Sequence, residues 1–338
     1  MKVFVMHEQA FAQRSQRAQI AQLRPIAQQV CHAFGVTATT LTCINHGFNT
    51  TYAVVDTQGH KYALRLNTHS LRDEQGLHAE VAWMQELAAA GVVRVPQLCH
   101  TPHGQCMVSV PFAPLGKELT ATMAHWLPGR IVGGRPSYQH ISALGTLSAQ
   151  LHQQSQHWRP QPPAAFPTIN RVLLNSPDHL TGQHESTIPA ELRQLLDEVR
   201  PQLDALFAEL NARFTIQPIH ADIHPYNVMW HQGELAVFDF DDAGLGLAVQ
   251  DIANSLYYVR DMAHADEAFF SGYQRIAPVP AVSPQELEGL LMARGIVLLN
   301  DLLVMTNPAD AAFVPEYLRR MTLRLRHFVT TGRFALCT

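Results

Sequence analysis

A short segment near position 220 combines acidic and amide side chains at a spacing that suits chemistry on a phosphate group. The stretch I-H-A-D-I-H-P-Y-N places Asp222 five residues before Asn227, and Asp239 comes twelve residues after Asn227, behind an apolar run. Transfer of a γ-phosphoryl group needs a carboxylate near the attacking hydroxyl and oxygen ligands that hold Mg²⁺ against the phosphates. Amide and carboxylate oxygens are the hard donors that Mg²⁺ prefers. The pattern therefore predicts phosphoryl transfer, with Asp222 near the hydroxyl and with Asn227 and Asp239 as metal ligands.

The same letters allow a second chemistry. In H-A-D-I-H the residues His220, Asp222 and His224 alternate, so on a strand they would face one side as ligands of a metal-dependent hydrolase. Pro225 would end a strand at this point. The sequence also contains no second His/Asp cluster that would complete a coordination set. Hydrolysis is therefore the weaker of the two interpretations.

The two acidic segments resemble the aminoglycoside phosphotransferase family, whose fold is similar to that of protein kinases. The likeness lies in H-A-D-I-H-P-Y-N-V and D-F-D-D-A-G, and the run that begins at Asp239 is especially similar to a stress-response protein kinase of this group. Choline, homoserine, methylthioribose and hydroxylysine kinases share the fold. The resemblance implies ATP and Mg²⁺ as cofactors and a small-molecule hydroxyl as the acceptor. It also implies that Asp222 is the catalytic base or the residue that orients that hydroxyl.

Further segments in the same order extend the resemblance over residues 37–260. The stretch N-H-G-F-N-T-T-Y-A-V is similar to the loop that covers the phosphates, and Y-A-L-R-L places Arg65 at a basic position on the third strand. The next helix carries Glu80, which the resemblance pairs with Arg65, and H-W-L-P-G-R resembles the hinge that binds adenine. The nucleotide-binding residues implied in this way are Gly47, Phe48, Asn49, Arg65, Glu80, His125, Trp126 and Leu127.

Four residues beside the catalytic segment have other expected roles. The resemblance places His220 beneath the loop and Asp251 at the start of the next helix, where its carboxylate would accept hydrogen bonds from the loop backbone. His224 fits either a hydrogen bond within the loop or a contact with the acceptor. Asp241 replaces a glycine of the family pattern, so it is a candidate for a second metal or for the acceptor.

Two departures from the family pattern leave other functions open. Arg65 stands where well-studied members have lysine, and the phosphate-covering loop has a single glycine. Arginine keeps the positive charge but presents a planar fork instead of a point charge, which alters how it can hold phosphates. A nucleotide-binding regulator without catalysis is one alternative. A Ser/Thr protein kinase of the stress-response type is another, although the chain lacks an obvious A-P-E segment for docking protein substrates.

Composition limits the compartment and the partners. The chain has 338 residues, 47% of them hydrophobic and 15% charged, with a net charge of −4 and no concentration of Lys and Arg. A large core is expected and a nucleic acid partner is not. No apolar run approaches the roughly 18 residues of a membrane span, and the N-terminus has no apolar stretch of signal-peptide length. Five cysteines without a C-x-x-C pair favour a reducing compartment, so we expect a cytoplasmic protein of undetermined oligomeric state.

Periodicity divides the chain into a strand-rich part and a helix-rich part. The pattern predicts one helix inside the strand-rich part, at 77–90, and strands at 39–44, 50–56, 62–66, 106–110 and 118–126. It predicts further helices at 15–34, 138–152, 191–210, 251–264, 284–305 and 315–331. We therefore expect an α+β, bilobal fold like that of protein kinases, with a small antiparallel-sheet lobe at residues 1–125 and a larger helical lobe at 126–338.

Overall fold

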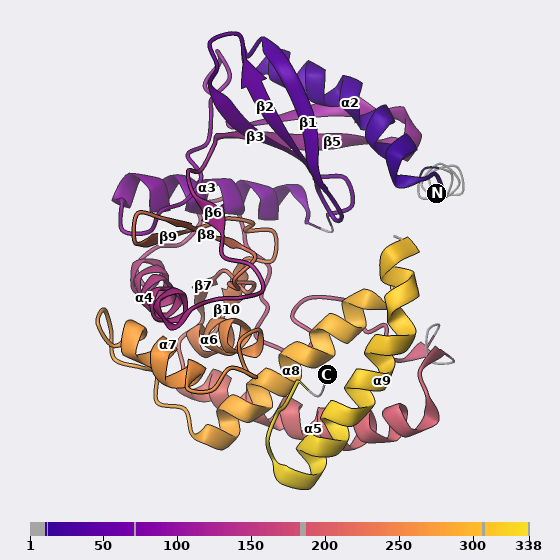
Figure 1. Ribbon diagram of the computed structural model, residues 1–338, viewed down its shortest axis with the longest axis vertical. Coiled ribbons are helices and arrows are strands. Elements are labelled where there is room, and N and C mark those ends of the chain that lie inside the picture. The colour runs from indigo at the N-terminus through magenta and orange to yellow at the C-terminus, as the bar shows by residue number, and fades with distance from the viewer. Residues whose placement is uncertain (1–10, 12, 71, 183–186, 306–307, 337–338) are drawn as a thin grey trace. The chain divides into compact units, whose positions relative to one another are not determined.

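The chain folds into two compact units. The computed structural model describes residues 11, 13–70, 72–182, 187–305 and 308–336 (Figure 1). The first unit comprises Met1–Asp73, Val81–Ala89 and Val95–Leu127. The second unit comprises Glu74–Glu80, Ala90–Arg94 and Pro128–Thr338. One helix, α3 (Glu74–Ala90), contributes residues to both units.

The first unit is built on a five-stranded antiparallel sheet with the strand order β1-β2-β3-β5-β4. Helix α2 (Gln16–Ala33) lies along one face of this sheet (Figure 1). A short 3₁₀ helix (Ala113–Leu115) joins the last two strands. The strands are β1 (Ala38–His46), β2 (Thr50–Asp56), β3 (Lys61–Leu66), β4 (Met107–Phe112) and β5 (Lys117–His125).

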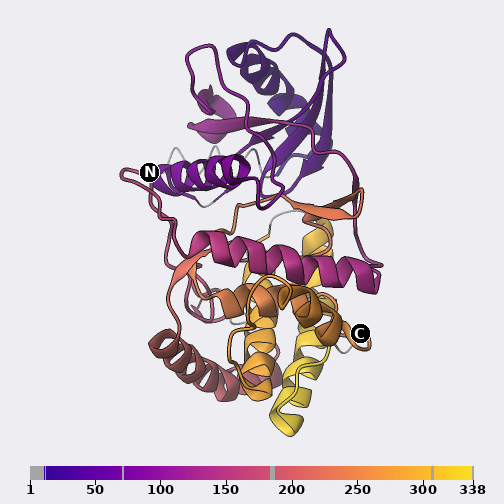
Figure 2. The same ribbon diagram turned by 90° about the vertical axis from the view of Figure 1, so that its left-hand side faces the viewer.

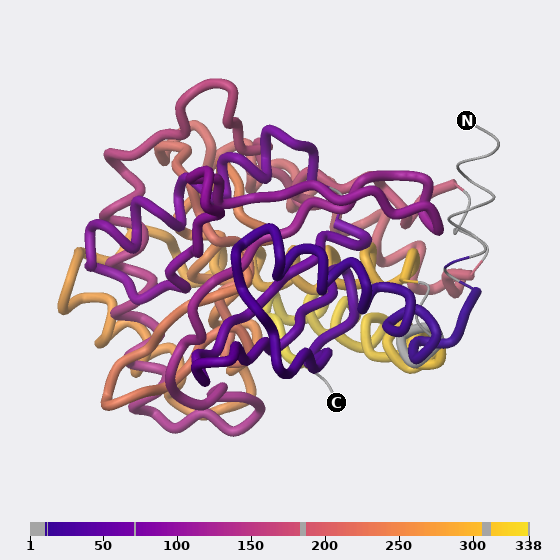
Figure 3. The backbone as a smooth tube through the Cα atoms, turned by 90° about the horizontal axis from the view of Figure 1, so that it is seen from above, coloured from indigo at the N-terminus to yellow at the C-terminus, as the bar shows by residue number. Residues whose placement is uncertain are grey.

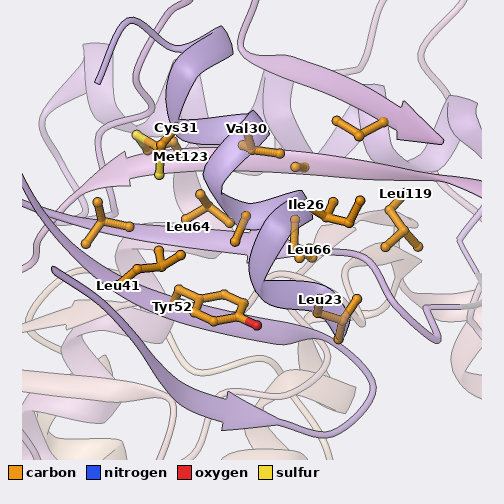
Figure 4. Packing of buried hydrophobic residues seen from close by; sticks show 14 of the residues in the cluster. Leu23, Ile26, Val30, Cys31, Leu41, Tyr52, Leu64, Leu66, Leu119 and Met123 are labelled. Carbon is orange, nitrogen blue, oxygen red and sulfur yellow. The ribbon is translucent and has the colours of Figure 1, made fainter. Parts of the chain in front are cut away.

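The core of the first unit lies between α2 and the sheet. Successive strand residues point to opposite faces, so alternate positions such as Leu64 and Leu66 turn toward the helix. Leu23 and Val30 of α2 lie seven residues apart, on the stripe that meets them (Figure 4). Because these side chains are fully buried, the helix fixes which face of the sheet remains open. Tyr52 also packs in this layer, and its hydroxyl donates a hydrogen bond to the Ile20 carbonyl at 3.2 Å.

Helices dominate the second unit. Helix α4 packs along α7 and also contacts α6, while α8 packs against both α6 and α9 (Figures 1 and 2). The path of the backbone through these helices is drawn in Figure 3. None of the helices among the described residues has both the length and the apolar character needed to span a membrane. The helices are α4 (Tyr138–Ser155), α5 (Ala190–Arg213), α6 (Ala248–Tyr257), α7 (Ala265–Tyr273), α8 (Pro284–Leu302) and α9 (Pro308–Thr331).

Two small sheets carry the loops of the second unit. One has the order β6-β8-β9, and in the other β10 pairs with β7. All of these pairings are antiparallel. The strands are β6 (Arg130–Ile131), β7 (Gln217–Ile219), β8 (Val228–His231), β9 (Glu234–Val237) and β10 (Gly244–Gly246).

Helix α8 begins where the sequence predicts. The Ser283 hydroxyl accepts a hydrogen bond from the Glu286 N–H at 3.2 Å, and the Glu286 carboxylate accepts one from the Ser283 N–H at 2.6 Å. This reciprocal cap satisfies donors that a helix start leaves unpaired, and Pro284 occupies the first helical position, where no N–H is needed. The helix is buried over most of its length and carries Arg294 and Asp301, which are discussed below.

Two predicted helix boundaries are wrong. The helix expected at 251–264 ends at Tyr257, and α7 begins only at Ala265. Tight turns with hydrogen bonds three residues apart separate the two helices, and His264 has a left-handed φ of 57°. The last helix begins at Pro308 and continues through Pro315, although proline removes a backbone donor there. Apolar residues continue through the short turns between α6 and α7, so their periodicity does not show where one helix ends and the next begins.

Replacing Gly145 by alanine tests the contact between α4 and α7. A Cβ at Gly145 would lie 1.9 Å from the Phe269 carbonyl oxygen, which belongs to backbone and cannot swing aside. We expect a loss of at least about 1–3 kcal/mol in the free energy of unfolding, measured in urea. Gly295→Ala is the control, because its nearest neighbour is a flexible Met292 side chain at 3.3 Å. Equal stability of both variants would contradict the close approach.

Candidate active site

The segment after β7 forms a loop whose backbone is held by Asp251. The Asp251 carboxylate accepts hydrogen bonds from the N–H of His220 at 2.9 Å and from the N–H of Ala221 at 2.6 Å. The Asn254 amide donates to the Ala221 carbonyl at 2.5 Å. Ala221 has a φ of 65°, which a non-glycine residue seldom adopts, so these bonds stabilise a strained backbone. The structural role predicted for Asp251 is confirmed.

Two buried histidines complete the support of the loop. The ring of His220 donates from Nε2 to the Phe238 carbonyl at 3.1 Å and accepts at Nδ1 from the Asp222 N–H at 3.3 Å. Burial lowers the pKa of His220, so its ring is neutral. His152, which the sequence analysis did not single out, contacts Asp251 at 3.2 Å. Because both nitrogens of His220 bond within the protein, this ring is not turned out as a metal ligand.

Asp222 accepts hydrogen bonds from three side chains. Its Oδ2 accepts from the Asn227 amide at 2.8 Å and from His224 Nε2 at 3.2 Å. Its Oδ1 accepts from Nη2 of Arg294, and the carboxylate keeps 19% of its surface exposed. Burial by itself would raise the pKa of Asp222, but the charge of Arg294 and the hydrogen bond from His224 outweigh it and hold the pKa below its usual range. The carboxylate is therefore an ionised acceptor at neutral pH.

Arg294 and Tyr258 belong to the site although the sequence analysis missed both. Nη2 of Arg294 also donates to the Tyr258 hydroxyl at 3.1 Å, and the Tyr258 and His224 rings lie 4.3 Å apart. Burial raises the pKa of Tyr258 to about 12, so its hydroxyl stays protonated. Arg294 was detectable in principle, because it interrupts the otherwise apolar run L-L-M-A-R-G-I-V-L-L. A buried arginine in such a run needs an acidic partner.

Asn227 and Asp239 lie at the same end of the β8–β9 ribbon. Val228 pairs with Val237, and the Phe238 N–H donates to the Asn227 carbonyl at 3.1 Å, so Asp239 follows directly beyond that bond. The Asn227 Nδ2 donates to Asp222, which leaves the amide Oδ1 facing the other way. An amide oxygen and a carboxylate are hard donors that fit Mg²⁺ or Ca²⁺. None of the described residues form a cluster of three or more His, Cys, Asp or Glu suited to a metal.

Further carboxylates surround this centre. Asp241 and Asp242 lie in the turn after Phe240, and Asp301 lies two helical turns beyond Arg294 on the same face of α8. Although part of Asp242 is exposed, its crowded surroundings and the nearby charge of Asp222 raise its pKa well above the usual range. Burial raises the pKa of Asp301 as well. Asp241, which the sequence analysis proposed as a contact of a second metal or of the acceptor, is thus the sequence neighbour of Asp242, whose pKa the charge of Asp222 helps to raise.

The first unit has an open pocket on the sheet face opposite α2. Its volume is about 280 Å³, near the lower end for small-molecule sites. Trp126 lies at its edge with 37% of its surface exposed, and the Trp126 N–H donates to the Lys61 carbonyl at 3.1 Å. The lining residues are Thr40, Thr42, Ala53, Val54, Val55, Lys61 and Trp126.

The other predicted nucleotide-binding residues of the first unit extend from this pocket along the sheet. Arg65 lies four residues beyond Lys61 on β3, hence on the same face and about 13 Å away. Arg65 pairs with Thr51 next to the β1–β2 turn that contains Gly47, and that turn is closed by a bond from the Gly47 N–H to the Asn49 carbonyl at 3.0 Å. In this unit Phe48 and His125 are exposed, Asn49 is buried, and Leu127 is half-buried.

Glu80 belongs to the second unit. It lies on α3, and its side chain is buried with 2% of its surface exposed. A solvated helix charge is therefore ruled out for this residue. Because Arg65 belongs to the first unit, the pairing of Arg65 with Glu80 stays a prediction.

The sequence matches a known family over most of its length. Residues 40–284 match the model of a family described as the phosphotransferase enzyme family. The match covers more than half of the chain, and the protein belongs to this family. The resemblance inferred from the acidic segments is thereby confirmed.

Curated relatives are more distant and are matched over part of their length. An uncharacterized protein of Synechocystis sp. is 28% identical over 249 residues, which are 70% of this chain and 66% of the relative. A homoserine kinase of Agrobacterium fabrum is 29% identical over 206 residues, 55% of this chain and 60% of the relative. An amicoumacin kinase of Bacillus subtilis is 26% identical over 208 residues, 59% and 57% of the two chains. The chain thus spans less than two thirds of the length of these relatives.

Solved structures are similar over nearly the whole chain. A microcompartment-associated aminopropanol kinase has a TM-score of 0.73 at 20% identity, covering 92% of this chain and 99% of that chain. An amicoumacin kinase in complex with AMP-PNP and Ca²⁺ has a TM-score of 0.70 at 18% identity, covering 91% and 96%. At such identities the likeness shows the fold alone. The expected α+β, kinase-like fold is confirmed.

Removing the Asp251 carboxylate tests the support of the loop. Asp251→Ala leaves the N–H groups of His220 and Ala221 and the His152 ring without their acceptor. We expect a loss of about 3–5 kcal/mol in the free energy of unfolding, because buried unsatisfied donors are costly. Asp251→Asn keeps one acceptor oxygen and should lose less. Asp204→Ala, on the exposed side of α5, is the control; urea midpoints that are the same for all three variants would contradict the role of Asp251.

Proposed function

We propose that this chain is a cytoplasmic kinase that uses ATP and Mg²⁺ to phosphorylate a hydroxyl group of a small molecule. The observation that carries the proposal is the arrangement at Asp222. This ionised carboxylate is fixed in a strained loop, its partner Asn227 donates to it from the amide nitrogen, and the Asn227 carbonyl accepts from the Phe238 N–H directly before Asp239. Phosphoryl transfer relies on positioning and electrostatics more than on covalent chemistry, and this geometry supplies both.

The nucleotide and the cation are proposed from the comparisons and the donor set together. Relatives are described as homoserine kinase and amicoumacin kinase, and one solved neighbour holds AMP-PNP and Ca²⁺. By extension this chain uses a nucleotide and a divalent cation, and Mg²⁺ suits the oxygen donors of Asn227 and Asp239. When bound, the cation neutralises charge on the phosphates.

Each unit has a part in this proposal. In the first unit the pocket beside Trp126 takes the base, and Arg65 steadies the α- and β-phosphates farther along the same sheet face. In the second unit Asp222 accepts a hydrogen bond from the acceptor hydroxyl and receives its proton as the phosphoryl group moves. The division of labour follows the two units, with the base pocket and Arg65 in the first unit, which extends to Leu127, and the catalytic, metal and acceptor groups in the second.

Asp222→Asn is the direct test of this function. The variant keeps the shape of the side chain but removes the charge that accepts the proton, so phosphate transfer should fall by roughly 10²–10⁴-fold. Binding of Mg²⁺ and AMP-PNP by calorimetry and the melting temperature should stay near wild type. The assay measures labelled phosphate transfer from ATP to amino alcohols, hydroxy amino acids, aminoglycosides and dephosphorylated casein, with Asp204→Asn as the control.

The same panel separates the alternative functions. Preferred labelling of casein would favour a protein kinase. Binding of Mg²⁺ and nucleotide without transfer to any acceptor would favour a regulator. Full activity of the Asp222→Asn variant would contradict the assigned role of the carboxylate.

Trp126→Ala tests the base pocket independently of the catalytic loop. Contacts between a base and an aromatic side chain are worth about 1–3 kcal/mol, so the Kd for AMP-PNP should rise roughly 5- to 150-fold. The turnover number at saturating ATP should change little, because Trp126 is proposed to contact the base and not the acceptor hydroxyl. Trp158→Ala is the matched control, since that indole packs against Phe166 in the second unit. Unchanged affinity after loss of Trp126 would place the base elsewhere.

A further inference from the structure

The hydrogen bonds at Asp222 leave little freedom for an incoming hydroxyl. A carboxylate offers about four lone-pair positions. Asn227 and His224 occupy two of them on Oδ2, and Arg294 occupies one on Oδ1. The position that remains lies on Oδ1, the oxygen that Arg294 contacts. The position of a hydroxyl bound there therefore depends on the direction in which Arg294 holds the carboxylate.

Asp222 and three other side chains form a closed ring of contacts. Arg294 contacts Asp222 and donates to the Tyr258 hydroxyl at 3.1 Å, the Tyr258 ring lies 4.3 Å from the His224 ring, and His224 Nε2 returns to Asp222 at 3.2 Å. The members come from the catalytic loop, the end of α6 and the middle of α8. Because α8 is a buried helix whose first turn is capped by Ser283, it holds this ring of contacts rigidly from outside the loop.

A purely structural role does not account for a charge at this position. The neighbours of Arg294 along α8 are apolar, and an apolar side chain of similar size would pack there without desolvating a guanidinium. Nε of Arg294 has no hydrogen-bond partner among the described residues, so its bonding is concentrated at the Nη2 that faces Asp222. Arg324 shows the structural alternative, because its Nε and Nη1 bond to the Leu336 carbonyl and the Tyr257 hydroxyl.

We propose that Arg294 is a positioning residue for phosphoryl transfer, which acts through Asp222 by fixing the direction of its carboxylate toward the acceptor hydroxyl. The inference rests on the proposed kinase function and adds to it a residue from α8, outside both acidic motifs. In a loose transition state little proton removal is needed before the phosphoryl group moves. A fixed acceptor serves such a reaction better than a mobile one, and Nη2 of Arg294 holds Oδ1 of Asp222 while it also donates to the Tyr258 hydroxyl.

The test compares Arg294→Gln with Arg324→Gln. Both arginines are buried in the second unit, with 5% and 4% of their surface exposed, and both donate to a tyrosine hydroxyl. The hydrogen bonds that Arg324 makes to the described residues go to Leu336, Tyr257 and Met321 and not to Asp222. For Arg294→Gln we expect kcat to fall by on the order of 100-fold, the cost of a small misplacement of a reacting group. The KM for Mg²⁺-ATP should stay within about twofold, because nucleotide contacts lie elsewhere. Arg324→Gln should lower the melting temperature and leave kcat within about twofold.

Two milder variants keep the test informative where a glutamine variant does not fold. Arg294→Lys restores the charge without the planar fork, so its kcat should lie between those of wild type and Arg294→Gln. Tyr258→Phe removes the hydroxyl that accepts a hydrogen bond from Nη2 of Arg294, so it should lower kcat without changing the KM for Mg²⁺-ATP. Parallel losses of kcat in the Arg294 and Arg324 variants, or a wild-type kcat in the Arg294 variants, would overturn the inference alone. Absence of transfer by the wild-type protein to every acceptor in the panel would overturn the proposed function instead.

Discussion

The site depends on one buried carboxylate that holds a strained loop. Asp251, in the first turn of α6, accepts the N–H groups of two successive loop residues, and one of them, Ala221, has a left-handed backbone. Such a conformation costs roughly 1–2 kcal/mol for a residue with a Cβ, and these hydrogen bonds offset that cost. Asp222 follows immediately in the chain. The direction of the Asp222 side chain therefore depends on a helix that lies outside the loop.

Two carboxylates of the second unit differ because their environments differ. Asp222 has a cation and two further donors, so its pKa lies below the usual range despite burial. Asp242 lies near the charge of Asp222 itself and titrates well above that range. Opposed shifts of neighbouring acids are typical of functional sites, where one group stays charged and the other is free to be neutral. The pKa values differ because Arg294 and His224 outweigh burial at Asp222, whereas desolvation and the charge of Asp222 outweigh the more distant Arg294 at Asp242.

The sequence predicted the local parts of this site and missed the part that depends on tertiary structure. Asp222, Asn227 and Asp239 belong to one loop–ribbon segment, so spacing alone brings them together. Arg294 is 72 residues from Asp222 along the chain, and only the packing of α8 on α6 joins them. Tyr258 was missed for a related reason: the sequence placed it inside a helix expected at 251–264, whereas α6 ends at Tyr257 and Tyr258 follows it. Apolar periodicity does not record where a buried helix stops.

The first unit shows how much an alternating pattern can determine. With α2 packed on one face of the sheet, every second residue of β3 must turn to the other face, which places Lys61 and Arg65 on the side of the pocket. Arg65, for which we propose contacts with the phosphates, therefore lies on the pocket side of the sheet, and its side chain is a planar fork and not an ammonium group. The strand fixes where the charge is, whereas the chemistry of the side chain fixes how phosphates are held. Under the proposed function, arginine in place of lysine would keep the place of the phosphate contact and change its geometry.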